Sequence, residues 1–472
     1  MKYNINFAFD YVFPTFILPN ATMPEFGVIN YLSSMHSLKA QNATTFEQSI
    51  NVSDIFDNEL GVMPNSNTGY FYQAQVYESI LNYKEEALYF RTRNPQSFIY
   101  PIKPTAVLSH FFGKNVGPNI RMNGEYFWKY ISKKAMEYIK DGKCKIFIDY
   151  SMEPFIEYET FLDIHNCLSL SDLPDKSVII CINSFNAKEL YESWFSESER
   201  KIEVRNLPFC LDHSSWYYSD SIVRKNNICM SIDDFYNTKN TIRDNHFLMK
   251  IRNAREHRTA LLYKMVSSDL LQYGDWSFLT PEQYNLQTVE FIIDSYNLQN
   301  IHLGKVKKLY DTSPHLLQSE QNITYNSTNA WTDKTYQPHS NSYFEICFET
   351  YIRTECKSLT EKIFKPIVNF QPFLFVAYPG ALQLLRDLGF KTFDGFIDES
   401  YDLETNNGLR VNKIYTEIER LSNMTKEEIH NWYWSMEDIL VHNHKTLIEY
   451  NSNKIFGGEL IKEFSDFTHK IV

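Results

Sequence analysis

The chain lacks several patterns that mark common classes of protein. Its seven cysteines are scattered without a Cys-x-x-Cys pair, and several lie in apolar runs where cysteine behaves as a small hydrophobic residue. A reducing compartment is therefore expected. No window reaches the roughly 20 uninterrupted apolar residues that a membrane span needs. The first residues do not follow the pattern of a secretory signal, so we expect a cytoplasmic protein without a membrane span.

Motifs for several kinds of site are also missing. There is no Gly-x-Gly-x-x-Gly after a strand, no phosphate-binding Gly-x-x-x-x-Gly-Lys-Ser/Thr and no Gly-x-Ser-x-Gly nucleophile motif. No Asp-x-Asp stands at the end of a strand, and no His, Cys, Asp and Glu residues recur at metal-ligand spacing. We therefore expect no metal site.

What the chain does contain indicates a globular protein of more than one domain. Its 472 residues are too many for one ordinary core, so two domains are expected. Hydrophobic residues make up 43% and charged residues 22%, with 35 Phe and 32 Tyr, which excludes a disordered chain. The net charge of −12 argues against a general polyanion-coating protein, although it allows a local basic cleft.

Apolar runs alternate with helical periodicity, which predicts an α/β fold with parallel sheets. The expected strands are 144–149, 177–182, 202–207, 247–251, 343–350 and 373–377, and the expected helices are 125–140, 187–195, 259–272, 380–388 and 425–450. Gly142 is a plausible helix stop, and Thr425 with Glu428 forms a capping box. The predicted domains are 1–245, 246–424 and a C-terminal helical part, 425–472.

A helix start with cations follows the apolar run 343–350. Thr360 is expected to cap this helix with its hydroxyl group, and Glu361 suits the first turn. Lys362 and Lys365 follow closely. Because ligands collect where the carboxyl end of a strand leads into a helix, this pattern fits a phosphate group, with a carboxylate available to ribose hydroxyls. The alternative is an amphipathic helix with an ordinary capping residue and solvated charges.

A second cationic turn, residues 250–258, lies between the expected strand 247–251 and the expected helix 259–272. Its arginines are Arg252, Arg255 and Arg258, and Lys250 precedes them. Guanidinium groups bind phosphate through paired hydrogen bonds, so this turn suits an oxyanion. The alternative is a basic turn that pairs with nearby acids.

The first of these segments resembles a known family. Thr360-Glu361-Lys362, followed by Phe364-Lys365-Pro366 and Gln371-Pro372-Phe373, is similar to the donor-binding segment of GT-B glycosyltransferases, and most similar to the Thr-Glu-Lys motif of the α1,3-fucosyltransferases. The resemblance implies that Glu361 contacts the nucleotide ribose and that Lys362 contacts the diphosphate. Glu349-Thr350 is expected to bind a sugar hydroxyl or to orient Lys362.

Residues 340–402 also resemble glycosyltransferase-like proteins of phages, giant viruses and bacteria. The similarity covers Pro379-Gly380 and the runs 385–393 and 398–402. The carboxylates of the run 398–402 could bind a cation, but in that family this run looks structural. Those proteins share an Asn-Arg-x-x-Arg-x-His-Arg segment, from which this chain departs because Arg252 precedes Asn253.

These resemblances imply a GT-B fold, in which two Rossmann-like domains enclose a cleft and C-terminal helices cross back to the first domain. They imply a glycosyltransferase that uses a nucleotide sugar, needs no metal and inverts stereochemistry. Arg252, Arg255, Arg258, Lys362 and Lys365 would neutralise the diphosphate leaving group.

The first domain is expected to supply a general base and the acceptor site. Asp149 and Glu153 follow an expected strand, so either carboxylate could take the acceptor's proton. The alternative is that Asp149 caps a turn and that Glu153 faces solvent. The acceptor is open between a glycan, a protein and a modified base in phage DNA. If the protein is viral, the expected location is the host cytoplasm. A non-catalytic nucleotide- or glycan-binding module of the same fold is the alternative function. The oligomeric state is not readable from the sequence.

Overall fold

The computed structural model describes residues 97–102, 133–150, 158–219, 227–280, 284–321, 335–352, 355–450, 463 and 466–467. The chain divides into two compact units. The first comprises Met1–Phe209 with Ser452–Val472, and the second comprises Cys210–Asn451. The expected domain boundary after residue 245 lies within the second unit, as do residues 425–451.

The first unit contains a parallel sheet. Its strands are β1 (Phe98–Ile102), β2 (Cys144–Tyr150), β3 (Val178–Ile182) and β4 (Glu203–Asn206), paired side by side in this order. The helices are α7 (Lys133–Lys140), α8 (Tyr158–Leu170) and α9 (Ala187–Trp194), with a short 3-10 turn η3 (Glu197–Glu199). Every residue of β3 is buried, as its continuous apolar run predicts. Gly142 ends α7 with a φ of 69°, so the expected stop is confirmed.

The second unit is built on another parallel sheet. Its strands are β5 (Asn245–Asn253), β6 (Gly274–Thr280), β7 (Ser342–Phe348) and β8 (Phe373–Val376), in the spatial order β6-β5-β7-β8. The helices are α10 (Phe209–Ser219), α12 (Ile232–Asn237), α13 (Glu256–Ser267), α14 (Leu286–Ser295), α15 (Leu303–Asp311), α16 (Gln337–Ser340), α17 (Glu361–Val368), α18 (Ala381–Asp387), α19 (Asn407–Ser422), α20 (Lys426–Trp434) and α21 (Glu437–Glu449). Short 3-10 turns are η4 (Leu270–Tyr273), η5 (Gln318–Glu320) and η6 (Glu399–Leu403). The predicted α/β class with parallel sheets is confirmed.

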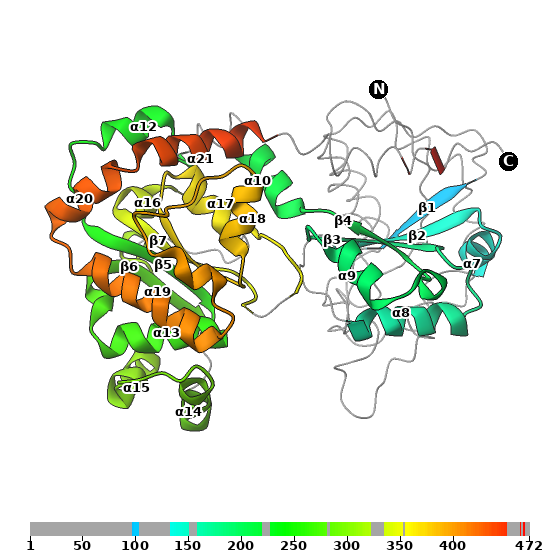
Figure 1. Ribbon diagram of the computed structural model, residues 1–472, viewed down its shortest axis with the longest axis horizontal. Helices are drawn as coiled ribbons and strands as arrows, with labels where there is room; N and C mark the ends of the chain where they lie inside the picture. Colours follow the sequence, from blue (N-terminus) through cyan, green and yellow to red (C-terminus); the bar gives the residue numbers. More distant parts are fainter. Residues whose placement is uncertain are drawn as a thin grey trace, which may run out of the picture. The chain divides into compact units, whose positions relative to one another are not determined.

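The order of the second sheet reverses direction between β5 and β7. The chain steps from β5 outward to β6, returns to the other side of β5 as β7, and then steps outward again to β8. Right-handed crossovers in opposite directions put α13 and α17 on opposite faces of the sheet. Accordingly α13 packs with α19, and α17 packs with α21 (Figure 1). Ligands of such sheets bind at the carboxyl ends of the strands where the order reverses.

Several elements differ from expectation, among them β6 and the helices of residues 425–450. Strand β6 is additional, and its first residue needs to be glycine because a Cβ on Gly274 would lie 2.1 Å from a ring carbon of Phe247. The expected long helix 425–450 is two helices, α20 and α21, separated at Ser435 and Met436. The capping box of Thr425 at the start of α20 is confirmed. In the described part of the chain, no helix has the length and apolar character needed to cross a bilayer.

Candidate functional site

The two cationic turns predicted from the sequence lie at the reversal point of the second sheet. One turn follows β5 and leads into α13, and the other follows β7 and leads into α17. Because β5 and β7 are paired and parallel, their carboxyl ends lie side by side. The N-termini of both helices therefore begin at the same edge of the sheet, where backbone N–H groups favour anions.

A single residue joins the two turns. Arg255 Nη1 donates a hydrogen bond to the carbonyl oxygen of Thr350 at 2.9 Å, and Lys362 Nζ donates to the hydroxyl oxygen of the same residue at 3.2 Å. The guanidinium of Arg255 also lies 4.9 Å from the ring centre of Tyr351. Two cations from distant parts of the sequence thus converge on one loop at the end of β7.

Glu349 holds this loop in shape. Its carboxylate is buried and accepts hydrogen bonds from the Thr360 N–H at 2.9 Å, the Thr360 hydroxyl at 2.6 Å and the Thr350 N–H at 2.6 Å. Thr360 is the N-cap residue of α17 by position, but its hydroxyl makes no capping bond. The expectation that this hydroxyl caps the helix is therefore wrong, because Glu349 offers it a buried anionic acceptor instead.

Arg258 and His257, in the first turn of α13, contact the main chain of Glu349. Arg258 Nη2 and His257 Nε2 each lie 3.1 Å from the carbonyl oxygen of Glu349. Burial, reinforced by the charge of Arg258, lowers the pKa of His257 to about 3, so the ring is neutral and donates its Nε2 proton. Burial and the neighbouring Arg255 lower the pKa of Arg258 to about 10. Both side chains therefore support the backbone next to Thr350, the residue that Arg255 and Lys362 contact.

Glu361 and Lys362 form a close pair at the start of α17. Lys362 Nζ lies 2.9 Å from Glu361 Oε1 and also donates to the Thr360 hydroxyl oxygen at 3.1 Å. Burial opposes the charge of Glu361, but Lys362 and then Lys365 outweigh it and hold the pKa of Glu361 below its ordinary value. Burial likewise opposes the charge of Lys362, yet Glu361 and Glu349 raise its pKa. Both groups are therefore charged at neutral pH.

The remaining predicted residues are spread more widely. Arg252 is exposed near the end of β5, and Lys365 is buried within α17. Asp149 lies in β2 of the first unit, opposite Cys181, and its side chain is outside what the structure describes. Glu153 lies outside the described residues. Of the eight predicted donor-binding residues, the structure brings together Arg255, Arg258, Glu349, Thr360, Glu361 and Lys362.

The acidic run 398–402 has structural partners. Glu399 accepts hydrogen bonds from the Thr392 hydroxyl at 2.8 Å and the Phe393 N–H at 2.6 Å, and Asp402 accepts from the Leu382 N–H at the start of α18 at 3.0 Å. Within the described ranges, no group of three or more His, Cys, Asp or Glu side chains is placed to hold a metal ion.

The sequence singled out Glu349-Thr350 for orienting Lys362, and Lys362 does contact Thr350. It did not predict the contact between Arg255 and Thr350 or the supporting contact of His257, because nothing in the spacing of these residues reveals them. Comparison with protein-family models, with curated proteins and with solved structures returns no match for this chain. The resemblance to GT-B glycosyltransferases therefore rests on the sequence motifs and stays a prediction.

Proposed function

We propose that this protein is a glycosyltransferase whose second unit binds a nucleotide-sugar donor. The observation that supports this most is the convergence of Arg255 and Lys362 on Thr350, at the reversal point of a parallel sheet. Two cations and two helix N-termini at one sheet edge suit a diphosphate better than they suit a singly charged anion.

In this proposal the diphosphate is the leaving group. Negative charge grows on it as the bond to the sugar breaks, and the ammonium and guanidinium groups stabilise that charge without a metal ion. Arg252 and Lys365 add positive charge nearby. Glu361, held ionised beside Lys362, accepts hydrogen bonds from the ribose hydroxyls.

Glu349, Arg258 and Thr360 have a supporting part in this chemistry. Their hydrogen bonds are made to one another's main chain or side chains, which fixes the loop before any ligand arrives. Pre-formed cation positions lower the reorganisation needed when charge develops. We accordingly assign Glu349 to orienting the loop and Lys362 rather than to binding a sugar hydroxyl.

The acceptor side is proposed for the first unit, with Asp149 or Glu153 as general base and with inversion of stereochemistry. The two units together would form a GT-B enzyme. A glycan, a protein or a modified DNA base remain the proposed classes of acceptor.

Incubation of the full chain with a panel of nucleotide sugars, with released sugar and nucleoside diphosphate measured over hours, tests the proposal. We expect slow hydrolysis of one donor, because active transferases pass some donor to water, and loss of that hydrolysis in Lys362→Ala. Tight binding of a nucleotide without turnover toward water or any acceptor would instead support the non-catalytic module. Absence of both binding and turnover across the panel would reject the proposed function.

A further inference from the structure

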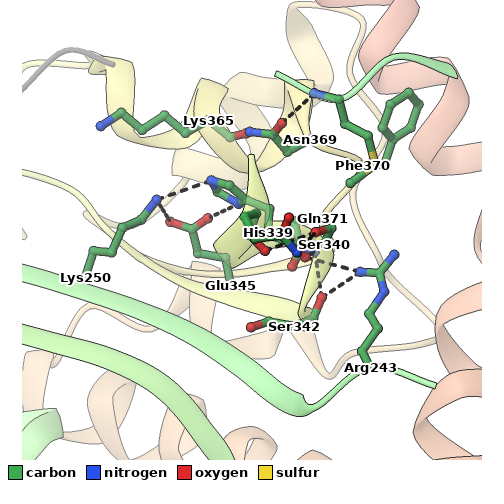
Figure 2. Close-up of polar contacts among 12 residues, drawn as sticks. Arg243, Lys250, His339, Ser340, Ser342, Glu345, Lys365, Asn369, Phe370 and Gln371 are labelled. Carbon is green, nitrogen blue, oxygen red and sulfur yellow. Dashed lines mark hydrogen bonds and ion pairs between the residues drawn. The ribbon is translucent and has the colours of Figure 1, made fainter. Parts of the chain in front are cut away.

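A polar triad of Lys250, Glu345 and His339 lies on the same sheet as the candidate site. Lys250 Nζ on β5 is 3.6 Å from Glu345 Oε1 on β7, and 3.3 Å from Nε2 of His339, which belongs to α16 (Figure 2). His339 Nδ1 lies 3.2 Å from the second oxygen of Glu345. The Glu345 side chain is 5% exposed and His339 is fully buried, whereas Lys250 is 22% exposed. Lys250 is therefore the member that reaches the surface.

The contact with Lys250 assigns the roles of the His339 ring nitrogens. An ammonium group has only donors, so we assign Nε2 of His339 as the acceptor and place the ring proton on Nδ1, which lies close to Glu345 Oε2 without hydrogen-bond geometry. The backbone of His339 is fixed as well, because Gln371 Nε2 donates to its carbonyl oxygen and to that of Ser342 (Figure 2). Glu345 and His339 thus hold the Lys250 ammonium from two directions.

Packing alone does not account for this triad. Removing a carboxylate and an ammonium from water costs several kcal/mol per ion, and apolar residues of similar size are often neutral or stabilising in their place. Charged groups kept in a core beside a candidate site are functional candidates.

Strand register places Lys250 next to the cationic turns. Met249 pairs with Ile346, so Lys250 lies beside Cys347, and its side chain is on the same sheet face as Glu345 and Cys347. Burial, Glu345 and Glu349 raise the pKa of Cys347, while Lys250 and Lys362 act in the opposite direction. Both ammonium groups therefore act electrostatically on the same buried thiol, one from β5 and the other from the start of α17.

We propose that Lys250 is a third diphosphate-binding cation, and that Glu345 and His339 are positioning residues which hold it toward the ligand. This inference rests on the proposed function, because it adds a contact to the same diphosphate. Arg255 and Lys362 approach the anion from the loop after β7, and Lys250 approaches it from the surface of the sheet.

Calorimetry of the full chain with inorganic pyrophosphate tests the inference. Lys250→Met should weaken pyrophosphate binding about tenfold, as expected for loss of one charge-assisted contact. Lys307→Met, which removes an exposed lysine from α15, is the matched control and should leave the affinity unchanged. Glu345→Gln should weaken binding through Lys250, and therefore should have no further effect in the Lys250→Met background.

Four results would overturn the inference. Unchanged affinity in Lys250→Met, with a loss in Arg255→Ala, would reject Lys250 while leaving the proposed function standing. A Glu345→Gln effect that persists without Lys250 would reject the positioning role. Failure of the wild-type chain to bind pyrophosphate or any nucleoside diphosphate would reject both proposals. Because Lys250→Met removes the ammonium partner of Glu345, the Lys250→Met/Glu345→Gln double variant is measured beside it. A protein that folds only with Lys250 present would assign the triad to stability alone.

Discussion

Arg255 and Lys362 contact the same residue, Thr350. They lie at the starts of α13 and α17, the helices that follow the paired strands β5 and β7. These contacts join the turn after β5 to the turn after β7. It follows that the proposed diphosphate site depends on Thr350 and Thr360, which Glu349 holds together.

Glu349→Gln should destabilise the second unit. An amide oxygen can accept only part of the three hydrogen bonds that the carboxylate accepts, and the amide NH2 would face the donors of Thr350 and Thr360. We expect the free energy of unfolding to fall by about 1–3 kcal/mol in urea denaturation. Glu290→Gln, at an exposed position on α14, should change it little. Equal stabilities of the two variants would show that Glu349 does not organise the loop.

Glu361→Gln should affect the binding of a nucleoside diphosphate and of pyrophosphate differently. Nucleoside diphosphate binding should weaken about tenfold, because a carboxylate bond to ribose is lost. Pyrophosphate binding should hold steady or strengthen, because the negative charge beside Lys362 disappears. Calorimetry with both ligands measures the contrast. A parallel loss for both ligands would mean that Glu361 serves the fold of the helix start.

His257 predicts a particular pH dependence of stability. Its pKa is lowered from 6.5 to about 3 by burial, so the unfolded chain binds a proton between these values and the folded chain does not. Stability should therefore be fully present above about pH 6.5 and should be lost as pH falls toward 3, with a slope of about 1.4 kcal/mol per pH unit from this group. Burial lowers the pKa of His165 to about 4, so the stability of the first unit should also fall as pH falls.

The measurement for His257 is urea denaturation at several pH values. His257→Gln should reduce the pH dependence of the free energy of unfolding of the second unit between pH 6.5 and 4. This holds even if the substitution also changes stability at pH 8. An identical slope in wild type and variant would contradict a neutral, buried His257.

Activity should survive removal of divalent metal. The proposed leaving group is neutralised by Arg255, Lys362 and Lys250, so donor hydrolysis in EDTA should equal that in buffer. Complete loss on chelation, restored by Mn²⁺, would overturn the assignment to a metal-independent transferase.

The sequence predicted most of the sheet framework because the buried strands are continuous apolar runs. Strands β3, β7 and β8 are fully buried and lie close to their expected ranges. Strand β6 was missed because Gly274, Asp275 and Ser277 interrupt its pattern. Asp275 is buried and accepts hydrogen bonds from the Gln318 N–H and the Ser319 hydroxyl, partners that only the folded loop supplies.

The site was predictable in kind but not in arrangement. Cations at helix starts after strands can be recognised from spacing, and Arg255 and Lys362 lie where that spacing puts them. The Thr360 hydroxyl donates to Glu349, which is eleven residues away along the chain. Lys250 contacts His339, which is 89 residues away. No local periodicity encodes such tertiary pairings.

The most direct test of the account is calorimetry with a nucleoside diphosphate and the corresponding bare nucleoside, on Arg255→Ala, Lys362→Ala and the double variant. Each single change should weaken diphosphate binding about tenfold and leave nucleoside binding nearly unchanged. The double variant should lose less than the sum of the two in free energy, because both cations act on one small anion. Salt should weaken wild-type binding more than that of the double variant. Equal losses for the diphosphate and the nucleoside would contradict the account, since these residues would then shape a pocket instead of binding phosphate.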